Sequence, residues 1–279
     1  MQRLVTVDWL ADRLTRPGAI VLDATLPPVG VTPPVDTRAR YTEHHIPGAV
    51  FFDIDELSDH STTLPHMLPA PESFARSMEQ LGLGDEMTII IYEQADVFSA
   101  PRAWWMLRTM GARDVHVLDG GLKAWMAAGL PTESGEVQRP AATFRAHFDE
   151  REVRSFDDVQ GMIAEHGQIL DARSAGRFAG STPEPRPGIS SGHMPGAISL
   201  PYTELLQEGR FKSSEALAET FRTRGVQLER PVTATCGSGV TAAVLLFALE
   251  LSGAPQVSLY DGSWAEYAQR PEAVIEKDS

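Results

Sequence analysis

At 279 residues, the chain is long enough for two ordinary domains with sizeable cores. Its 42% hydrophobic and 22% charged residues are typical of a globular protein and exclude a disordered or fibrous one. The formal net charge of −14 repels phosphate backbones, which argues against nucleic acid as a partner.

Targeting and membrane segments are not expected from the sequence. No apolar run approaches the roughly 18 residues that a membrane-spanning helix needs. The start, MQRLVTVDWLADRL, carries Asp8 and Asp12 in an amphipathic pattern and lacks the apolar centre and cleavage site of a secretory signal. The single cysteine, Cys236, has no partner for an internal disulfide, which fits a reducing compartment. We therefore expect a cytoplasmic protein that does not associate with a membrane.

Short apolar runs alternate with helix-like segments along the chain. We expect buried strands at 19–23, 87–92, 115–119, 168–172, 231–235 and 256–260. Helices are expected between them, among others at 71–82, 101–111 and 241–253. This alternation predicts α/β domains, each with a mainly parallel sheet covered by helices on both faces. Ligands bind such sheets at the carboxyl ends of the strands.

The second half of the chain repeats the first. VLDAT at 21–25 returns as ILDAR at 169–173, and HIPGAV at 45–50 returns as HMPGAI at 193–198. VLDGGLKAW at 117–125 is matched by LYDGSWAEY at 259–267. Three matches in the same order indicate two copies of one fold. The stretch at 130–144 has the Pro- and Gly-containing composition of a connection. We place the first domain at 1–138, a linker at 139–152 and the second domain at 153–279.

Cys236 directly follows the strand-like run PVTAT and opens the loop CGSGV before a helix-like run. A lone cysteine is usually a small residue of the core. Core positions rarely need two glycines behind them, however, whereas Gly237 and Gly239 allow the loop to curl tightly. Backbone N–H groups and the positive end of the next helix would then face the Cys236 sulfur and stabilise a thiolate or a persulfide. The loop therefore predicts chemistry at an anionic sulfur.

Two related kinds of loop are excluded because their characteristic side chains are missing. A phosphate-binding P-loop needs Lys-Ser or Lys-Thr after the glycines, and a cysteine phosphatase loop needs an arginine on its far side. Residues 237–243 supply neither.

In the first copy, Glu93 stands where Cys236 stands in the second. A carboxylate cannot act as a thiolate nucleophile, so we expect the first domain to be catalytically inactive.

The chain resembles the tandem rhodanese-domain sulfurtransferases over essentially its whole length. The matching motifs are HIPGA, HMPGA, APRAWWM at 100–106, LDGGLKAW at 118–125, DARSAGRF at 171–178, TPEPR at 182–186, CGSGVTA at 236–242 and YDGSW at 260–264. The resemblance implies two rhodanese-like domains, of which the second carries the active cysteine. It implies that Cys236 takes a sulfane sulfur from a donor and passes it to a thiophilic acceptor.

Gly237 and Ser238 resemble the 3-mercaptopyruvate branch of that family, because thiosulfate-using members carry a basic pair after the cysteine. Without two cations a thiosulfate dianion binds less well, and the Ser238 hydroxyl can hydrogen-bond a ketone or a departing enolate. The resemblance also implies that Arg177 and Arg186 hold the substrate carboxylate. The alternative is that both are solvated arginines in a Pro- and Gly-rich loop. The rest of the donor site is expected at Gly237, Gly239, Val240 and Thr241.

A histidine is a further candidate. In the mercaptopyruvate branch the histidine that matches His45 is placed near the loop serine as part of a proton relay, and Asp36 could orient it. His193 occupies the same repeat position in the second copy. A structural role for both histidines, capping the turn before a strand, is therefore an equal alternative. Asp23 and Asp171 end their strands at equivalent positions, where we expect structural pairing.

The predicted reaction moves sulfur from 3-mercaptopyruvate through a Cys236 persulfide to cyanide, a small thiol or a protein thiol such as thioredoxin, and releases pyruvate. It needs no cofactor. We predict no metal site, because His44, His60 and His66 are scattered without ligand spacing. Two alternatives stay open, a thiosulfate sulfurtransferase and a non-enzymatic persulfide carrier or redox module. The arginine pair speaks against a carrier, which needs no carboxylate clamp.

Overall fold

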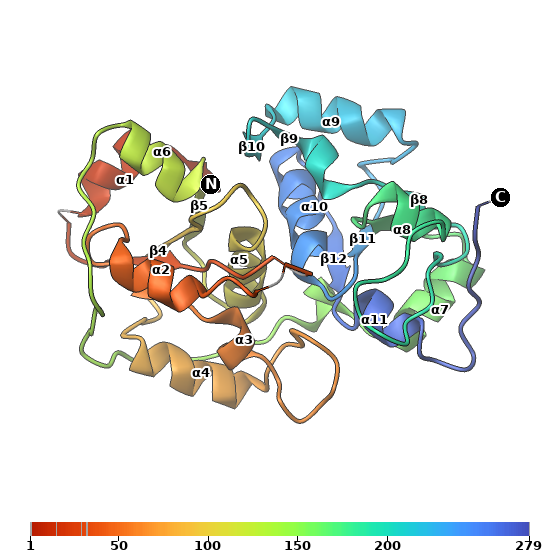
Figure 1. The fold of residues 1–279 in the computed structure, drawn as a ribbon, viewed down its shortest axis with the longest axis horizontal. Helices are drawn as coiled ribbons and strands as arrows, with labels where there is room; N and C mark the ends of the chain where they lie inside the picture. The colour runs from red at the N-terminus through yellow and green to blue at the C-terminus, as the bar shows by residue number, and fades with distance from the viewer. Residues whose placement is uncertain (1, 15, 29, 32, 279) are drawn as a thin grey trace. The chain divides into compact units, whose positions relative to one another are not determined.

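The computed structural model describes residues 2–14, 16–28, 30–31 and 33–278. They form two compact units, Met1–Asp59 with Leu68–Asp149, and His60–Met67 with Glu150–Ser279. Each unit contains a five-stranded parallel sheet with helices packed against it (Figure 1).

The first unit consists, in chain order, of β1 (Leu4–Val5), α1 (Val7–Leu14), β2 (Ala19–Asp23), α2 (Thr37–Glu43), β3 (Val50–Phe51), α3 (Ile54–Leu57), α4 (Pro71–Gln80), β4 (Thr88–Tyr92), α5 (Ala100–Thr109), β5 (Val115–Leu118) and α6 (Gly121–Ala127). The second consists of η1 (Glu150–Glu152), β6 (Val153–Arg154), α7 (Phe156–Ala164), β7 (Gln168–Asp171), α8 (Ala175–Ala179), β8 (Ile198–Ser199), η2 (Tyr202–Leu205), β9 (Leu206–Gln207), β10 (Arg210–Phe211), α9 (Ser214–Thr223), β11 (Val232–Thr235), α10 (Val240–Leu251), β12 (Val257–Tyr260) and α11 (Ser263–Tyr267).

The two sheets have the same topology. Their strand orders are β1-β5-β4-β2-β3 and β6-β12-β11-β7-β8, so each strand of the first sheet has a counterpart at the same place in the second. The register agrees as well, because Asp23 pairs with Tyr92 and Asp171 pairs with Thr235. The predicted fold of two α/β domains with mainly parallel sheets is confirmed. The edge strands, each two residues long, are too short to leave a pattern in the sequence.

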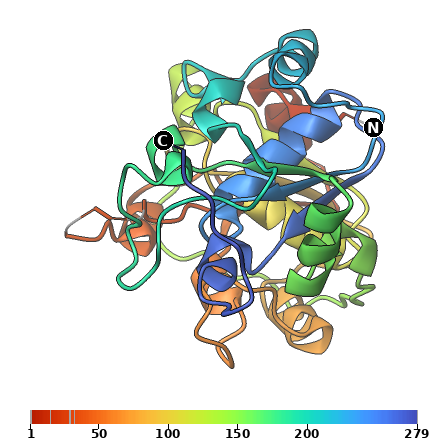
Figure 2. The ribbon, with the colours of Figure 1, turned by 90° about the vertical axis from the view of Figure 1, so that its right-hand side faces the viewer.

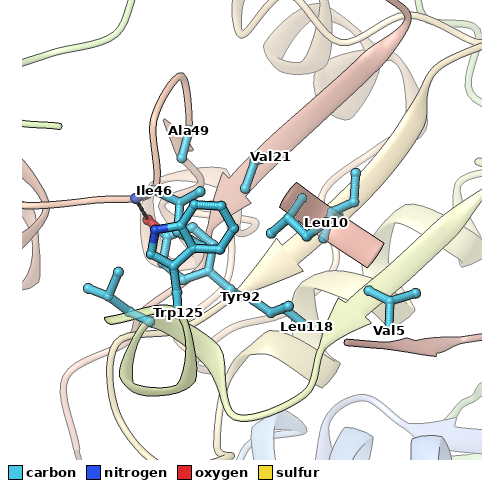
Figure 3. Packing of buried hydrophobic residues seen from close by; sticks show 10 residues of the cluster. Val5, Leu10, Val21, Ile46, Ala49, Tyr92, Leu118 and Trp125 are labelled. Atoms are coloured by element: carbon cyan, nitrogen blue, oxygen red, sulfur yellow. Dashed lines mark hydrogen bonds between the residues drawn. The ribbon is translucent and has the colours of Figure 1, made fainter. Parts of the chain in front are cut away.

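One part of the core of the first unit lies between its sheet and helices α1 and α6. Val21 and Leu118, on β2 and β5, pack with Leu10 of α1 and Trp125 of α6 (Figure 3). The Tyr92 hydroxyl reaches the loop after α2 and accepts a hydrogen bond from the backbone N–H of Ile46 at 3.2 Å. This packing fixes the carboxyl end of β4. The corresponding position in the second unit is the carboxyl end of β11.

The second unit has its most buried helix directly behind the Cys236 loop. Nine of the twelve residues of α10, VTAAVLLFALEL, are buried, as expected of a helix that is apolar on all sides. Figure 2 shows α9 next to α10, which packs on β11 and β12. On the opposite face, α7 and α11 enclose a cluster around Val159, Tyr260 and Trp264. The helix that follows the loop is therefore rigidly held.

The predicted linker at 139–152 does not form a free connection. The backbone N–H groups of Ala142 and His147 donate to the carbonyl oxygens of Glu79 and Met110, at 3.2 and 2.9 Å. These bonds dock the strap onto the ends of α4 and α5, so the first compact unit extends to Asp149. The segment His60–Met67 belongs to the second unit although the sequence division places it in the first domain.

Candidate active site

Cys236 is the first residue after β11, at the carboxyl end of the central strand of the second sheet. The residue is 2% exposed, and α11 fixes its backbone. Its carbonyl oxygen accepts from the Trp264 N–H at 2.9 Å, and its own N–H donates to Ser263 Oγ at 3.4 Å. The Gly237 carbonyl accepts from the Ala265 N–H at 3.0 Å. Both sides of the peptide after Cys236 are thus held in place.

The N-terminus of α10 begins within this loop. Gly239 is the N-cap residue, with φ of 79°, in the left-handed region that favours glycine. No side chain caps the helix, so the first-turn N–H groups have no acceptor supplied by the helix or its cap. These groups and the positive end of the helix dipole favour an anion at the loop. Val240 is buried and Thr241 half-buried in this turn, and their roles in the donor site stay predictions.

Arg177 and Arg186 both lie against the loop. A Cβ atom built on Gly237 would stand 2.8 Å from Nη2 of Arg177 and 3.8 Å from Nη1 of Arg186. Arg177 comes from α8, and Arg186 from the loop that follows α8. The structure therefore places both guanidinium groups beside the residue next to Cys236. A Cβ atom at position 237 would displace the Arg177 guanidinium group, whereas glycine leaves room for this close approach.

A buried carboxylate, Glu184, joins the arginine cluster. Its side chain is 3% exposed and pairs with Arg177 and with Arg173, whose Nη1 lies 2.9 Å from Glu184 Oε1. Arg173 also binds Asp171 at 2.6 Å and stacks 4.1 Å from the ring centroid of Trp264. Burial alone would lower the pKa of Arg173, but the two carboxylates outweigh it and raise that pKa. Neither Glu184 nor Arg173 was a candidate from the sequence.

The histidine that contacts Ser238 is His66, which sequence reasoning missed. Nδ1 of His66 lies 2.9 Å from Ser238 Oγ, although 172 residues separate the two in the chain. His66 has φ of 60°, a conformation that costs energy for a residue other than glycine and that clusters at functional sites. Ser238 itself is 6% exposed. The two prolines that flank His66 at 65 and 69 were the only local signal of a constrained segment.

The predicted pair of Asp36 and His45 is not formed. The Asp36 carboxylate accepts from the Ala39 N–H at 2.8 Å and caps α2 instead. The His45 ring is fully buried, stacks on Tyr41 and has Nδ1 2.8 Å from the Tyr41 carbonyl oxygen. An Asp36 side chain that is committed to the helix end cannot orient this ring.

His193 repeats the arrangement of His45 in the second unit. Its Nδ1 lies 3.0 Å from the Phe178 carbonyl oxygen, and its ring stacks on Phe178. His45 and His193 each form an isolated β-bridge to a later segment, at Glu133 and Glu276. The shared pattern favours the structural interpretation of both histidines.

Asp23 and Asp171 are fully buried and satisfied in different ways. Asp171 has the Arg173 guanidinium as its partner. The Asp23 carboxylate accepts hydrogen bonds from the Thr25 hydroxyl and from Gln94 Nε2, at 2.5 and 2.9 Å. Burial raises the pKa of Asp23. Both contacts are the structural pairing expected at the strand ends.

Glu93 occupies the position of Cys236 in the first unit. Its carbonyl oxygen accepts from the N–H at the start of α6, as that of Cys236 does from α11. Its carboxylate accepts from the backbone N–H groups of Phe98, Ser99 and Ala100 at 2.9, 2.9 and 3.2 Å, and from Ser99 Oγ at 3.0 Å. Burial raises the pKa of Glu93 to about 7, against the effect of these bonds. In this unit the loop holds its own carboxylate.

None of the helices in the described part of the chain combines the length and the apolar character that crossing a membrane requires. Among the same residues, no group of three or more His, Cys, Asp or Glu side chains is arranged to hold a metal ion.

Comparison with known proteins gives consistent matches. A family model described as the rhodanese-like domain matches residues 6–128 and 155–270. The 3-mercaptopyruvate sulfurtransferase of Escherichia coli strain K12 is 45% identical over 275 residues, covering 98% of this chain and 97% of the relative. The thiosulfate sulfurtransferase of Gallus gallus is 40% identical, with coverage of 96% and 93%. The crystal structure of SseA from Escherichia coli, described as a 3-mercaptopyruvate sulfotransferase, has a TM-score of 0.88 at 43% identity and coverage of 95% and 99%.

Proposed function

The chain belongs to the rhodanese-like family, with two copies of the domain, and we propose that it is a sulfurtransferase that takes sulfur from 3-mercaptopyruvate and passes it to a thiophilic acceptor. The sulfurtransferase function predicted from the sequence is confirmed by these relatives. The observation that carries the choice of donor is the position of Arg177 and Arg186 beside Gly237. Two guanidinium groups next to the cysteine suit a donor that bears a carboxylate.

In the first half-reaction, the Cys236 thiolate attacks the sulfur of 3-mercaptopyruvate, forming the S–S bond while the C–S bond of the donor breaks. The electron pair of that bond goes to the carbon, which leaves as the enolate of pyruvate. The proton of the donor thiol ends on the methyl group of pyruvate, and Cys236 retains a persulfide anion. Arg177 and Arg186 hold the carboxylate so that the sulfur faces Cys236.

Ser238 and His66 are suited to move the proton. The Ser238 hydroxyl, two residues after Cys236, can hydrogen-bond the ketone oxygen as it becomes an enolate. His66 Nδ1 at 2.9 Å can exchange a proton with that hydroxyl. This assigns to His66 the relay that the sequence placed at His45.

In the second half-reaction, an acceptor attacks the outer sulfur of the persulfide and Cys236 leaves as thiolate. With cyanide the product is thiocyanate, and with a thiol it is a new persulfide. Thioredoxin as a protein acceptor and a cytoplasmic location stay predictions. One nucleophile that serves two half-reactions implies ping-pong kinetics. The catalytic inactivity of the first domain is part of the proposal, supported by Glu93 at the equivalent position.

The test is a steady-state assay at neutral pH with cyanide as acceptor and either 3-mercaptopyruvate or thiosulfate as donor, on the wild type and on Cys236→Ser. We expect a strong preference for 3-mercaptopyruvate and loss of all transfer in the variant. A preference for thiosulfate, the donor named for one of the relatives, would reject the proposed donor but leave Cys236 as nucleophile. Transfer that survives in Cys236→Ser would reject the mechanism.

A further inference from the structure

Glu184 is a buried carboxylate placed between Arg173 and Arg177, and Arg177 lies against the Cys236 loop. Both of its oxygens engage one edge of the Arg177 guanidinium group, with Nε 3.1 Å from each. Nη2 of Arg177, on the same edge, is also the atom that approaches Gly237. Glu184 therefore determines which way the planar group of Arg177 faces at the loop.

The other side of Glu184 is attached to a fixed anchor. Arg173 is fully buried and is held by Asp171, by stacking on Trp264 and by the Gly192 carbonyl oxygen, which accepts from its Nη2 at 2.7 Å. Its Nη1 lies 2.9 Å from Glu184. The chain of contacts from Asp171 through Arg173 and Glu184 to Arg177 thus connects the end of β7 with the Cys236 loop. A side chain as long as arginine would otherwise sample many rotamers at a position that is 22% exposed.

We infer that Glu184 is a positioning residue for the sulfur donor, acting through Arg177. It fixes the guanidinium group over Gly237 before the donor arrives, so that binding does not have to order that side chain. It also moderates the charge, because the carboxylates of Asp171 and Glu184 offset the positive charges of Arg173 and Arg177. The inference rests on the proposed function, since it assumes that Arg177 binds the donor.

The test uses Glu184→Gln, which keeps the shape of the side chain and removes its charge. Because the mechanism is ping-pong, kcat/KM for the donor and kcat/KM for cyanide report separately on the two half-reactions. We expect kcat/KM for 3-mercaptopyruvate to fall about tenfold, mainly through KM, which is the size expected from loss of one charge-assisted contact. The value for cyanide should change less than about twofold. Equal losses in both half-reactions would indicate a merely structural role, and no loss would also reject the inference.

Glu204→Gln is the matched control, because Glu204 pairs with Arg224 in the same unit and is partly exposed. It should leave both values unchanged. A double-mutant cycle with Arg177→Met tests the route, since Glu184→Gln should have no further effect on the donor once Arg177 is gone. An undiminished effect in that background would overturn the inference. If Glu184→Gln does not fold, Glu184→Asp, which retracts the carboxylate by one methylene, should give a smaller loss confined to the donor.

The two proposals can fail separately. The wild-type preference between 3-mercaptopyruvate and thiosulfate tests the proposed function. If thiosulfate is preferred, the same variants are measured with thiosulfate, and a loss confined to the donor half-reaction still supports the positioning role. Losses that are equal in both half-reactions with whichever donor is used reject it.

Discussion

Replacing Glu93 by glutamine tests whether the first unit carries a buried acid with an unusual proton affinity. Glu93 is 4% exposed, and its carboxylate accepts four hydrogen bonds from its own loop. Burial nevertheless raises its pKa from 4.5 to about 7. A group whose pKa is higher in the folded state than in the unfolded state binds its proton more tightly when folded. The contribution of Glu93 to the stability of the unit is therefore fully present below about pH 4.5 and is lost as the pH rises through about 7.

The size of the effect follows from the shift. A difference of one pKa unit corresponds to about 1.4 kcal/mol, so the full shift contributes roughly 3 kcal/mol of unfolding free energy. Between pH 5 and pH 8 most of this range is crossed, and roughly 2 to 3 kcal/mol should be lost. A glutamine at position 93 cannot ionise, so Glu93→Gln lacks this part of the pH dependence. The variant should gain roughly 2 to 3 kcal/mol relative to the wild type between these pH values, whatever its stability at pH 5.

Urea unfolding of both proteins at pH 5, 6, 7 and 8, followed by tryptophan fluorescence, measures this difference. Four of the five tryptophans lie in the first unit, so the signal reports mainly on its unfolding. Glu86→Gln is the control, because Glu86 is an exposed carboxylate in the same unit. If the unfolding free energies of Glu93→Gln and the wild type differ by the same amount at every pH, the loop bonds offset burial completely and the reasoning is refuted.

Two further predictions concern the second unit. A Cβ atom at Gly237 would stand 2.8 Å from Arg177 Nη2, so Gly237→Ala should lower kcat/KM for 3-mercaptopyruvate by about tenfold or more, measured with each substrate varied in turn. The φ angle of Gly237 is outside the left-handed region, so alanine fits the backbone and the loop should keep its shape. An equal loss of kcat/KM for cyanide would show instead that the loop is distorted. Because His66 contacts Ser238 at 2.9 Å, His66→Asn should slow pyruvate release in a single turnover by about 100-fold. An unchanged rate of that step would exclude His66 from the proton relay.

The amino-acid sequence predicts the parts of this protein that depend on local patterns. Buried runs of β-branched residues, such as TIIIY in β4, predict strands to within one residue, because apolar strands in a parallel sheet carry that pattern wherever they lie. The internal repeat predicts two copies of one fold, which the matching strand orders confirm. The glycines around Cys236 predict a tight loop before a helix, and α10 begins there.

Contacts between side chains that are far apart in the chain are set by the tertiary structure alone. His66 and Ser238 are 172 residues apart, and nothing near His66 in the sequence indicates its partner. In the sequence, Glu184 is an acidic residue in a Pro-rich loop with no sign of a special role. The fold buries it between Arg173 and Arg177. Conversely, His45 looks like a catalytic candidate until its ring nitrogen is found on a backbone carbonyl. A local pattern reports on the backbone of its own segment, whereas the partner of a polar side chain depends on which segments the packed sheets bring together.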